Sequence, residues 1–108
     1  MALKYPELFQ PFKIGTAAIK NRIVMSPMMT GGWFDEHGVI TNEVLDYYEE
    51  RAKGGVGLIY TTAFCLNPGF ETAGMVFRSP FDHPEGFLSQ MKKLTDRIHP
   101  YGAKLFIQ

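Results

Sequence analysis

The sequence predicts an α/β fold built around a parallel β-sheet, and two observations support this prediction. Three short apolar segments, at residues 23–25, 56–60 and 105–107, run without alternation between apolar and polar residues. Such continuous segments are typical of strands that are buried on both faces, as in parallel sheets. The two long segments between them carry apolar residues at helical spacing. The resulting order of strand, helix, strand, helix, strand favours right-handed βαβ crossovers.

A small hairpin is predicted ahead of the first of these strands. Residues 12–14 and 19–21 have the character of two short strands, and a turn that begins with a glycine, residues 15–18, lies between them. We expect this hairpin to close the N-terminal end of the sheet.

The first helix is predicted over residues 41–53. Its buried face consists of the apolar residues Val44, Leu45, Tyr48 and Ala52. Thr41 or Asn42 can cap its start with a side-chain oxygen. Gly54 and Gly55 can supply the left-handed backbone that commonly ends a helix.

The second helix is predicted to run from residue 84 or 85 to residue 99. Its apolar face consists of Phe87, Leu88, Met91, Leu94 and Ile98. Asp82 is the expected cap, with Pro84 in the first turn, where a missing N–H costs nothing. Pro100 and Gly102 end the helix.

Long loops are predicted after the carboxyl ends of the first two strands. Residues 26–40 and 63–83 exceed the two to six residues that usually connect a strand to a helix. The turns that lead from helix to strand are short. Since binding groups on a parallel sheet lie in the loops after its strands, we expect the functional site at the carboxyl edge.

The length of 108 residues limits how much of a larger fold this segment can form. A (β/α)8 TIM barrel uses about 250 residues, or about 31 for each unit, so the chain corresponds to about three and a half units. That length suits the hairpin, two βα units and a third strand. We therefore expect residues 1–108 to be the N-terminal segment of an incomplete (β/α)8 TIM-barrel domain.

The composition excludes several classes of partner. The 11 basic and 11 acidic residues cancel, so neither nucleic acid nor an anionic membrane surface is expected. No apolar segment approaches the roughly 20 residues of a membrane span, and the first residues lack the apolar core of a signal peptide. The single cysteine, Cys65, favours a reducing compartment such as the cytoplasm. The three histidines share no ligand spacing with Cys65, so no metal site is expected.

The segment Asn-Arg-Ile-Val-Met-Ser-Pro-Met-Met-Thr-Gly at residues 21–31 is the most specific stretch of the chain. Pro27 cannot donate a ladder hydrogen bond, so the strand is expected to end there, and the backbone beyond it is free to face a ligand. A strand end packed with methionines is the alternative structural interpretation. Farther along this loop, Trp33 and Phe34 either line a ligand pocket or anchor the loop.

This segment resembles the first-strand signature of the old yellow enzyme family of FMN-dependent ene-reductases. Residues 8–15 resemble that family's opening hairpin, residues 47–59 its first helix and second strand, and residues 94–108 its second helix and third strand. Thr30 and Gly31 are similar to a pair found in the 2,4-dienoyl-CoA-reductase-like branch. The resemblance covers nearly the whole chain, in order.

The resemblance implies that five residues contact the flavin. Pro27 and Met28 would touch the isoalloxazine ring through backbone atoms. Met29 would lie near the reactive edge of the ring, where its thioether can hydrogen-bond only weakly. Ala63 matches a small residue beside the flavin. Gln108 matches a glutamine that bonds the pyrimidine ring, where an amide can both donate and accept.

The resemblance also implies an activity. FMN would take a hydride from NAD(P)H and pass it to an activated alkene or enone, with the catalytic residues beyond Gln108. We therefore expect the isolated 108-residue chain to be inactive and to need the rest of the barrel or a partner chain. The alternative is a non-catalytic βα module that assembles with itself or a partner chain. A flavodoxin-like fold fits less well, because residues 26–29 do not resemble a phosphate-binding loop.

Overall fold

The computed structural model describes residues 2–29, 33–67, 71–72, 75–76 and 79–108 of the chain. In chain order the elements are η1 (Pro6–Phe9), β1 (Phe12–Ile14), β2 (Ala17–Ile19), β3 (Val24–Met25), α1 (Asn42–Lys53), β4 (Leu58–Tyr60), β5 (Glu71–Thr72), β6 (Met75–Val76), α2 (Pro84–Ile98), η2 (His99–Tyr101) and β7 (Lys104–Phe106). These elements confirm the predicted α/β class. The short antiparallel pair β5–β6, within the second long loop, was not predicted from the sequence.

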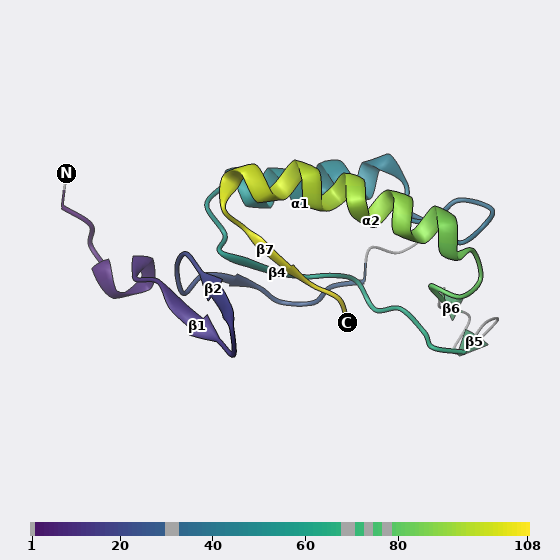
Figure 1. Cartoon of the computed structure of the whole chain (residues 1–108), viewed down its shortest axis with the longest axis horizontal. Coiled ribbons are helices and arrows are strands. Elements are labelled where there is room, and N and C mark those ends of the chain that lie inside the picture. Colours follow the sequence, from purple (N-terminus) through teal and green to yellow (C-terminus); the bar gives the residue numbers. More distant parts are fainter. Residues whose placement is uncertain (1, 30–32, 68–70, 73–74, 77–78) are drawn as a thin grey trace.

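The central sheet has three parallel strands in the order β3-β4-β7. Its register pairs Met25 with Ile59 and Ile59 with Leu105, so these three side chains point to the same face. Both α1 and α2 lie over that face (Figure 1). The sheet and the helices therefore form two layers with an apolar core between them. Within the described residues, neither helix is long and apolar enough to cross a lipid bilayer.

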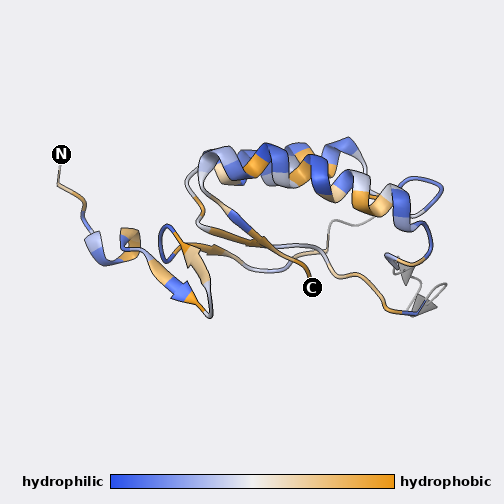
Figure 2. Ribbon diagram, in the orientation of Figure 1, coloured by the Kyte–Doolittle hydropathy of each residue, from blue (hydrophilic) through white to orange (hydrophobic). Residues whose placement is uncertain are grey.

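The core between the two layers uses the helix faces that the sequence predicted, with one exception. Its buried members are Ile40, Val44, Leu45, Tyr48, Ala52, Ile59, Met91, Leu94, Ile98 and Ala103. Figure 2 shows hydrophobic residues concentrated in the strands, whereas both helices alternate between hydrophobic and hydrophilic residues. Leu88 is 66% exposed, so its predicted place on the buried face of α2 is wrong.

The helix ends are stabilised differently from the prediction. Thr41 is the N-cap of α1 and His83 is the N-cap of α2, but neither side chain makes a capping hydrogen bond. The prediction that Asp82 caps α2 is wrong. Its Oδ2 instead accepts a hydrogen bond from the backbone N–H of Ser79, at 3.0 Å, which fixes the turn before the helix. After α1, Gly55 adopts the predicted left-handed backbone, with φ of 105°.

The hairpin of β1 and β2 lies at the N-terminal end of the sheet, as predicted (Figure 1). Its last pair joins Ile14 to Ala17, so residues 15–16 alone form the turn. The predicted second strand at residues 19–21 is therefore displaced by two residues from the observed β2. Gly15 makes this tight turn accessible, because its φ of 57° lies in the left-handed region that two-residue hairpin turns require.

The second face of the central sheet carries no helix among the described residues (Figure 1). Tyr60 and Phe106 pack edge to face, with ring centroids 5.6 Å apart, and both remain half-buried. Val24 on the neighbouring strand is 41% exposed. The radius of gyration is 15.4 Å, compared with about 13 Å for a compact domain of this length. The chain therefore has an open and elongated shape.

Candidate functional site

The three parallel strands end at one edge of the sheet, and the residues that follow them meet there. The last strand residues are Met25, Tyr60 and Phe106. A cavity of about 110 Å³ lies beyond them, lined by Pro27, Met28, Met29, Ala63 and Gln108. The structure thus brings together all five residues for which the sequence predicted a contact with the cofactor.

Gln108 is fixed by its backbone and leaves its side chain available. Its backbone N–H donates to Oγ1 of Thr61 at 3.2 Å, and its carbonyl accepts from the N–H of Phe64 at 3.0 Å. The residue itself is exposed, and its side-chain amide makes no hydrogen bond within the described part of the chain. A donor and an acceptor are therefore presented together at the cavity.

The segment after β3 gives the cavity an apolar wall. Met28 and Met29 are 51% and 49% exposed, which is unusual for side chains of this hydrophobicity. Pro27 precedes them and ends the strand, as predicted. Within the described residues, the backbone amides of Met28 and Met29 donate no hydrogen bond to the protein. These amides and the polarisable thioethers are available to a ligand.

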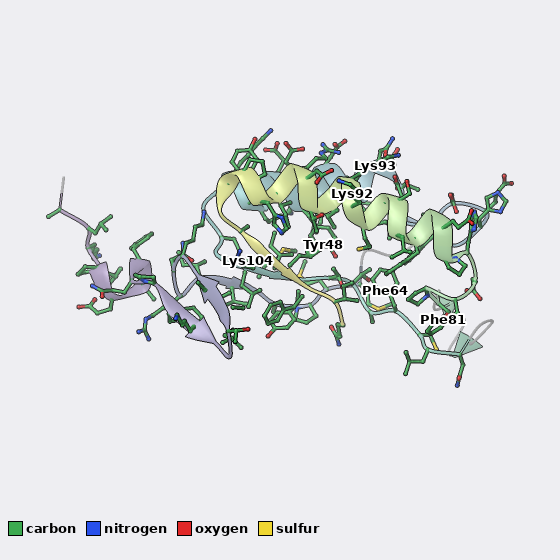
Figure 3. The ribbon with its side chains drawn as sticks, viewed as in Figure 1. Tyr48, Phe64, Phe81, Lys92, Lys93 and Lys104 are labelled. Carbon is green, nitrogen blue, oxygen red and sulfur yellow. The ribbon has the colours of Figure 1, made fainter. Side chains whose placement is uncertain are left out.

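The end of β4 is anchored by two hydroxyl groups that the sequence analysis did not assign to the site. The buried Tyr48 hydroxyl accepts a hydrogen bond from the N–H of Thr62 at 2.7 Å, immediately before Ala63. Tyr48 is labelled in Figure 3 between the helices and the sheet. Burial raises the pKa of this hydroxyl, so it remains neutral. The second hydroxyl belongs to Thr61, which is fully buried and holds Gln108. Two consecutive threonines directly after an apolar strand were the sequence feature that could have indicated an anchored strand end.

The aromatic residues of the first long loop anchor that loop and do not line the cavity. Trp33 packs edge to face on Tyr47, with ring centroids 5.4 Å apart. Phe34 packs in the same manner on Phe64, at 6.3 Å. These contacts agree with the anchoring interpretation that the sequence left open. Thr30 and Gly31, on which the branch resemblance depended, lie outside the described residues.

A wider groove of about 630 Å³ lies between the helices and is lined by Asn42, Leu45, Asp46, Lys93, Asp96 and Arg97. The Arg97 guanidinium in this groove already pairs with Asp46 and Glu49. Figure 3 shows Lys92 and Lys93 on the helical layer, away from the sheet. The groove therefore has the character of a solvated, ion-paired helix surface rather than a binding site.

The cavity at the strand ends suits one edge of a flat heteroaromatic ring. Its volume of about 110 Å³ is too small for a whole nucleotide. None of its five lining side chains carries a charge, so these residues do not form a phosphate site. The free amide of Gln108 matches an edge that offers a carbonyl beside an N–H, as the pyrimidine ring of a flavin does. The lining therefore fits an isoalloxazine edge.

A parallel sheet with an uncharged cavity at its carboxyl edge is compatible with a flavin-dependent oxidoreductase, and comparisons with known proteins point to that class. The sequence profile of the NADH:flavin oxidoreductase / NADH oxidase family matches residues 7–108. The cinnamate reductase of Clostridium sporogenes is 38% identical over 106 residues, which are 97% of this chain and 16% of that protein. The NADPH dehydrogenase of Bacillus subtilis is 38% identical over 103 residues, 94% of this chain and 29% of that protein.

Solved structures give the same result. The old yellow enzyme from Trypanosoma cruzi superposes with a TM-score of 0.78 at 31% identity, over 98% of this chain and 27% of that one. The chain belongs to the NADH:flavin oxidoreductase / NADH oxidase family, and its resemblance to old yellow enzymes is confirmed. Members of this family use FMN, with NAD(P)H as the reductant. The chain spans 16% to 29% of the length of the two curated relatives named above.

Proposed function

We propose that the protein is an FMN-dependent NAD(P)H oxidoreductase of the old yellow enzyme type that reduces activated alkenes or enones. In this proposal residues 1–108 supply one edge of the flavin site. The observation that supports it is the convergence of Pro27, Met28, Met29, Ala63 and Gln108 on a single cavity. They come from three separate parts of the chain, and the parallel sheet aligns them at one edge.

Each lining residue has a physical role in holding the ring. Bound FMN would supply the chemistry, by accepting a hydride and passing it on. The Gln108 amide would orient the pyrimidine ring by donating to a carbonyl and accepting from an N–H. The backbone after Pro27 and the Met29 side chain would lie against the ring, and the small Ala63 would leave room for it. None of these groups is suited to donate a proton to substrate, and the family resemblance implies that the catalytic residues lie beyond Gln108.

We also propose that residues 1–108 are the N-terminal part of a (β/α)8 barrel, in which β3, α1, β4, α2 and β7 form the first strands and helices. The face of the sheet that carries Tyr60 and Phe106 would become the inside of that barrel. The exposure of Val24 and the elongated shape support this proposal. The rest of the barrel or a partner chain would then cover this face. The cytoplasm remains the proposed location, since Cys65 is a free thiol.

The first experiment tests the flavin site in the intact protein. Purified protein should show the visible absorption of bound flavin, and NADH or NADPH should bleach it under anaerobic conditions. Gln108→Ala should weaken FMN binding by about tenfold, because hydrogen bonds to the ring edge are lost. Gln10→Ala, at an exposed position near the N-terminus, is the matched control and should bind FMN as the original protein does. A colourless protein that does not take up FMN would contradict the proposal.

A second experiment tests whether residues 1–108 suffice for activity. The isolated segment should show no NAD(P)H-dependent reduction of an enone such as cyclohexenone, because it carries only one edge of the site. Steady turnover by the purified segment would contradict this expectation.

The alternative function is a non-catalytic βα module that assembles with itself or a partner chain. The uncovered aromatic face of the sheet, with Tyr60 and Phe106, is the observation that favours it. A colourless protein that forms a stable oligomer would favour this alternative over the flavoenzyme.

A further inference from the structure

We propose that the buried hydroxyl of Thr61 is a positioning group for Gln108 and thereby sets the direction in which the Gln108 amide meets the ring. This inference rests on the proposed flavin site. It concerns a residue that lies behind the cavity wall and does not line it. Thr61 would therefore act through Gln108 and not by contact with the ligand.

The hydrogen bond between these two residues replaces a regular bond of the β-ladder. Tyr60 and Phe106 are the last residues paired between β4 and β7, and the N–H of Thr61 still donates to the carbonyl of Phe106 at 3.0 Å. Continuing the same register would direct the N–H of Gln108 to the main-chain carbonyl of Thr61. It goes instead to Oγ1 of Thr61, at 3.2 Å.

This replacement moves the segments that follow β4 and β7 out of regular strand pairing, at the place where the cavity lies. One bond later, the carbonyl of Gln108 accepts from the N–H of Phe64 at 3.0 Å. The two residues between Thr61 and Phe64, which are Thr62 and Ala63, thus bend around Gln108 rather than running parallel to it. A side chain that can accept is needed at position 61 to hold this arrangement.

Burial makes the arrangement specific. Thr61 is 0% exposed, so water cannot substitute for its oxygen if the hydroxyl is removed. The neighbouring Thr62 is held independently by the Tyr48 hydroxyl. Without Oγ1, the N–H of Gln108 must either remain unpaired or shift to the carbonyl of Thr61. Either outcome rotates the residue that carries the amide, while the amide itself stays chemically intact.

The test compares variants at position 61 in the intact protein. Thr61→Val keeps the shape and removes the acceptor, whereas Thr61→Ser keeps the acceptor. Titration of apoprotein with FMN should show about tenfold weaker binding for Thr61→Val and no more than about twofold for Thr61→Ser. Thr95→Val, which removes a hydroxyl bonded to Lys92 on α2, is the control and should bind FMN normally. Thr61→Ala removes the same hydroxyl and replaces the valine variant if that variant does not fold.

A double-mutant cycle separates positioning from a general structural role. If Thr61 acts through the amide, adding Thr61→Val to Gln108→Ala should weaken FMN binding no further. Both single variants should also lower the midpoint potential of the bound flavin, because a ring carbonyl that gains charge on reduction loses its donor. Gln108→Ala deletes that donor, and Thr61→Val misplaces it. Additive losses in the cycle, or unchanged affinity and potential in Thr61→Val, would overturn the inference. Failure of the unmodified protein to bind FMN would instead overturn the proposed function, and this inference with it.

Discussion

The helical side of the sheet and its carboxyl edge use the same kinds of residue in opposite ways. Between sheet and helices, Val44, Leu94 and Ile98 are completely buried. At the carboxyl edge, the apolar Met28 and Met29 are about half exposed, and the amide of Gln108 has no partner in the described chain. The comparison indicates that the helical side supplies stability, while the edge keeps its binding groups available for a ligand.

The largest effect on stability should come from truncating a core side chain, compared with the same truncation at the carboxyl edge. Leu94→Ala leaves a cavity in a fully buried position and should lower the free energy of unfolding by about 3 kcal/mol. Met29→Ala should change it by less than about 0.5 kcal/mol, because about half of the side chain is already exposed. Chemical denaturation of both variants measures the difference. Equal destabilisation would show that the edge is as tightly packed as the core.

Two glycines after α1 allow a matched comparison at the opposite, N-terminal end of the sheet. A Cβ on Gly57 would lie 3.1 Å from the carbonyl oxygen of Asn21 and would also clash with its side chain. That side chain cannot easily move, because it donates to the carbonyl of Gly55 at 2.7 Å. Gly57→Ala should therefore destabilise the fold by about 2 kcal/mol. Gly54→Ala, which meets only ordinary contacts from 3.4 Å, should remain within about 0.5 kcal/mol in the same denaturation experiment.

Tyr48 connects the helical side to the carboxyl edge, because its ring is in the core and its hydroxyl binds the backbone after β4. Tyr48→Phe removes the acceptor of the Thr62 N–H and should cost about 1 kcal/mol of stability. Because burial raises the pKa of this hydroxyl in the folded state, its contribution is complete below about pH 10 and is lost as the pH rises through the raised value. Stability measured against pH should thus fall less steeply above pH 10 in Tyr48→Phe. Identical alkaline profiles would show that this hydroxyl is not part of the alkaline transition.

The smallest effects should come from ion pairs on the outer surface of the helices. Arg97 joins α2 to Asp46 and Glu49 on α1, so Arg97→Gln should cost less than about 1 kcal/mol, and less still at high salt. Lys92→Gln breaks a pair within α2, with Asp96 at 2.7 Å, and should cost no more than about 0.5 kcal/mol. Thermal unfolding at low and high salt measures both. A larger loss for Lys92→Gln would contradict this order.

The sequence predicted the layers and the lining of the cavity better than it predicted the connections. Apolar periodicity identified both helices, because burial against a sheet imposes it over many residues. The sequence analysis assigned Asp82 as a helix cap and missed its hydrogen bond to Ser79, because caps and turns favour the same residue types. The β5–β6 pair comprises only two residues in each strand, too few to show a pattern. The role of Thr61 depends on which of its two oxygens Gln108 meets, and only the three-dimensional arrangement shows that.

The absence of charge among the five lining residues has a consequence for ligand choice. A site edge built from one amide, two thioethers, a proline and an alanine would interact with the proposed flavin ring and would make no charged contact with the tail of the molecule. Riboflavin and FMN would make the same contacts here. Any preference for the phosphorylated form must then come from elsewhere in the protein, so ring recognition and tail recognition can be altered independently.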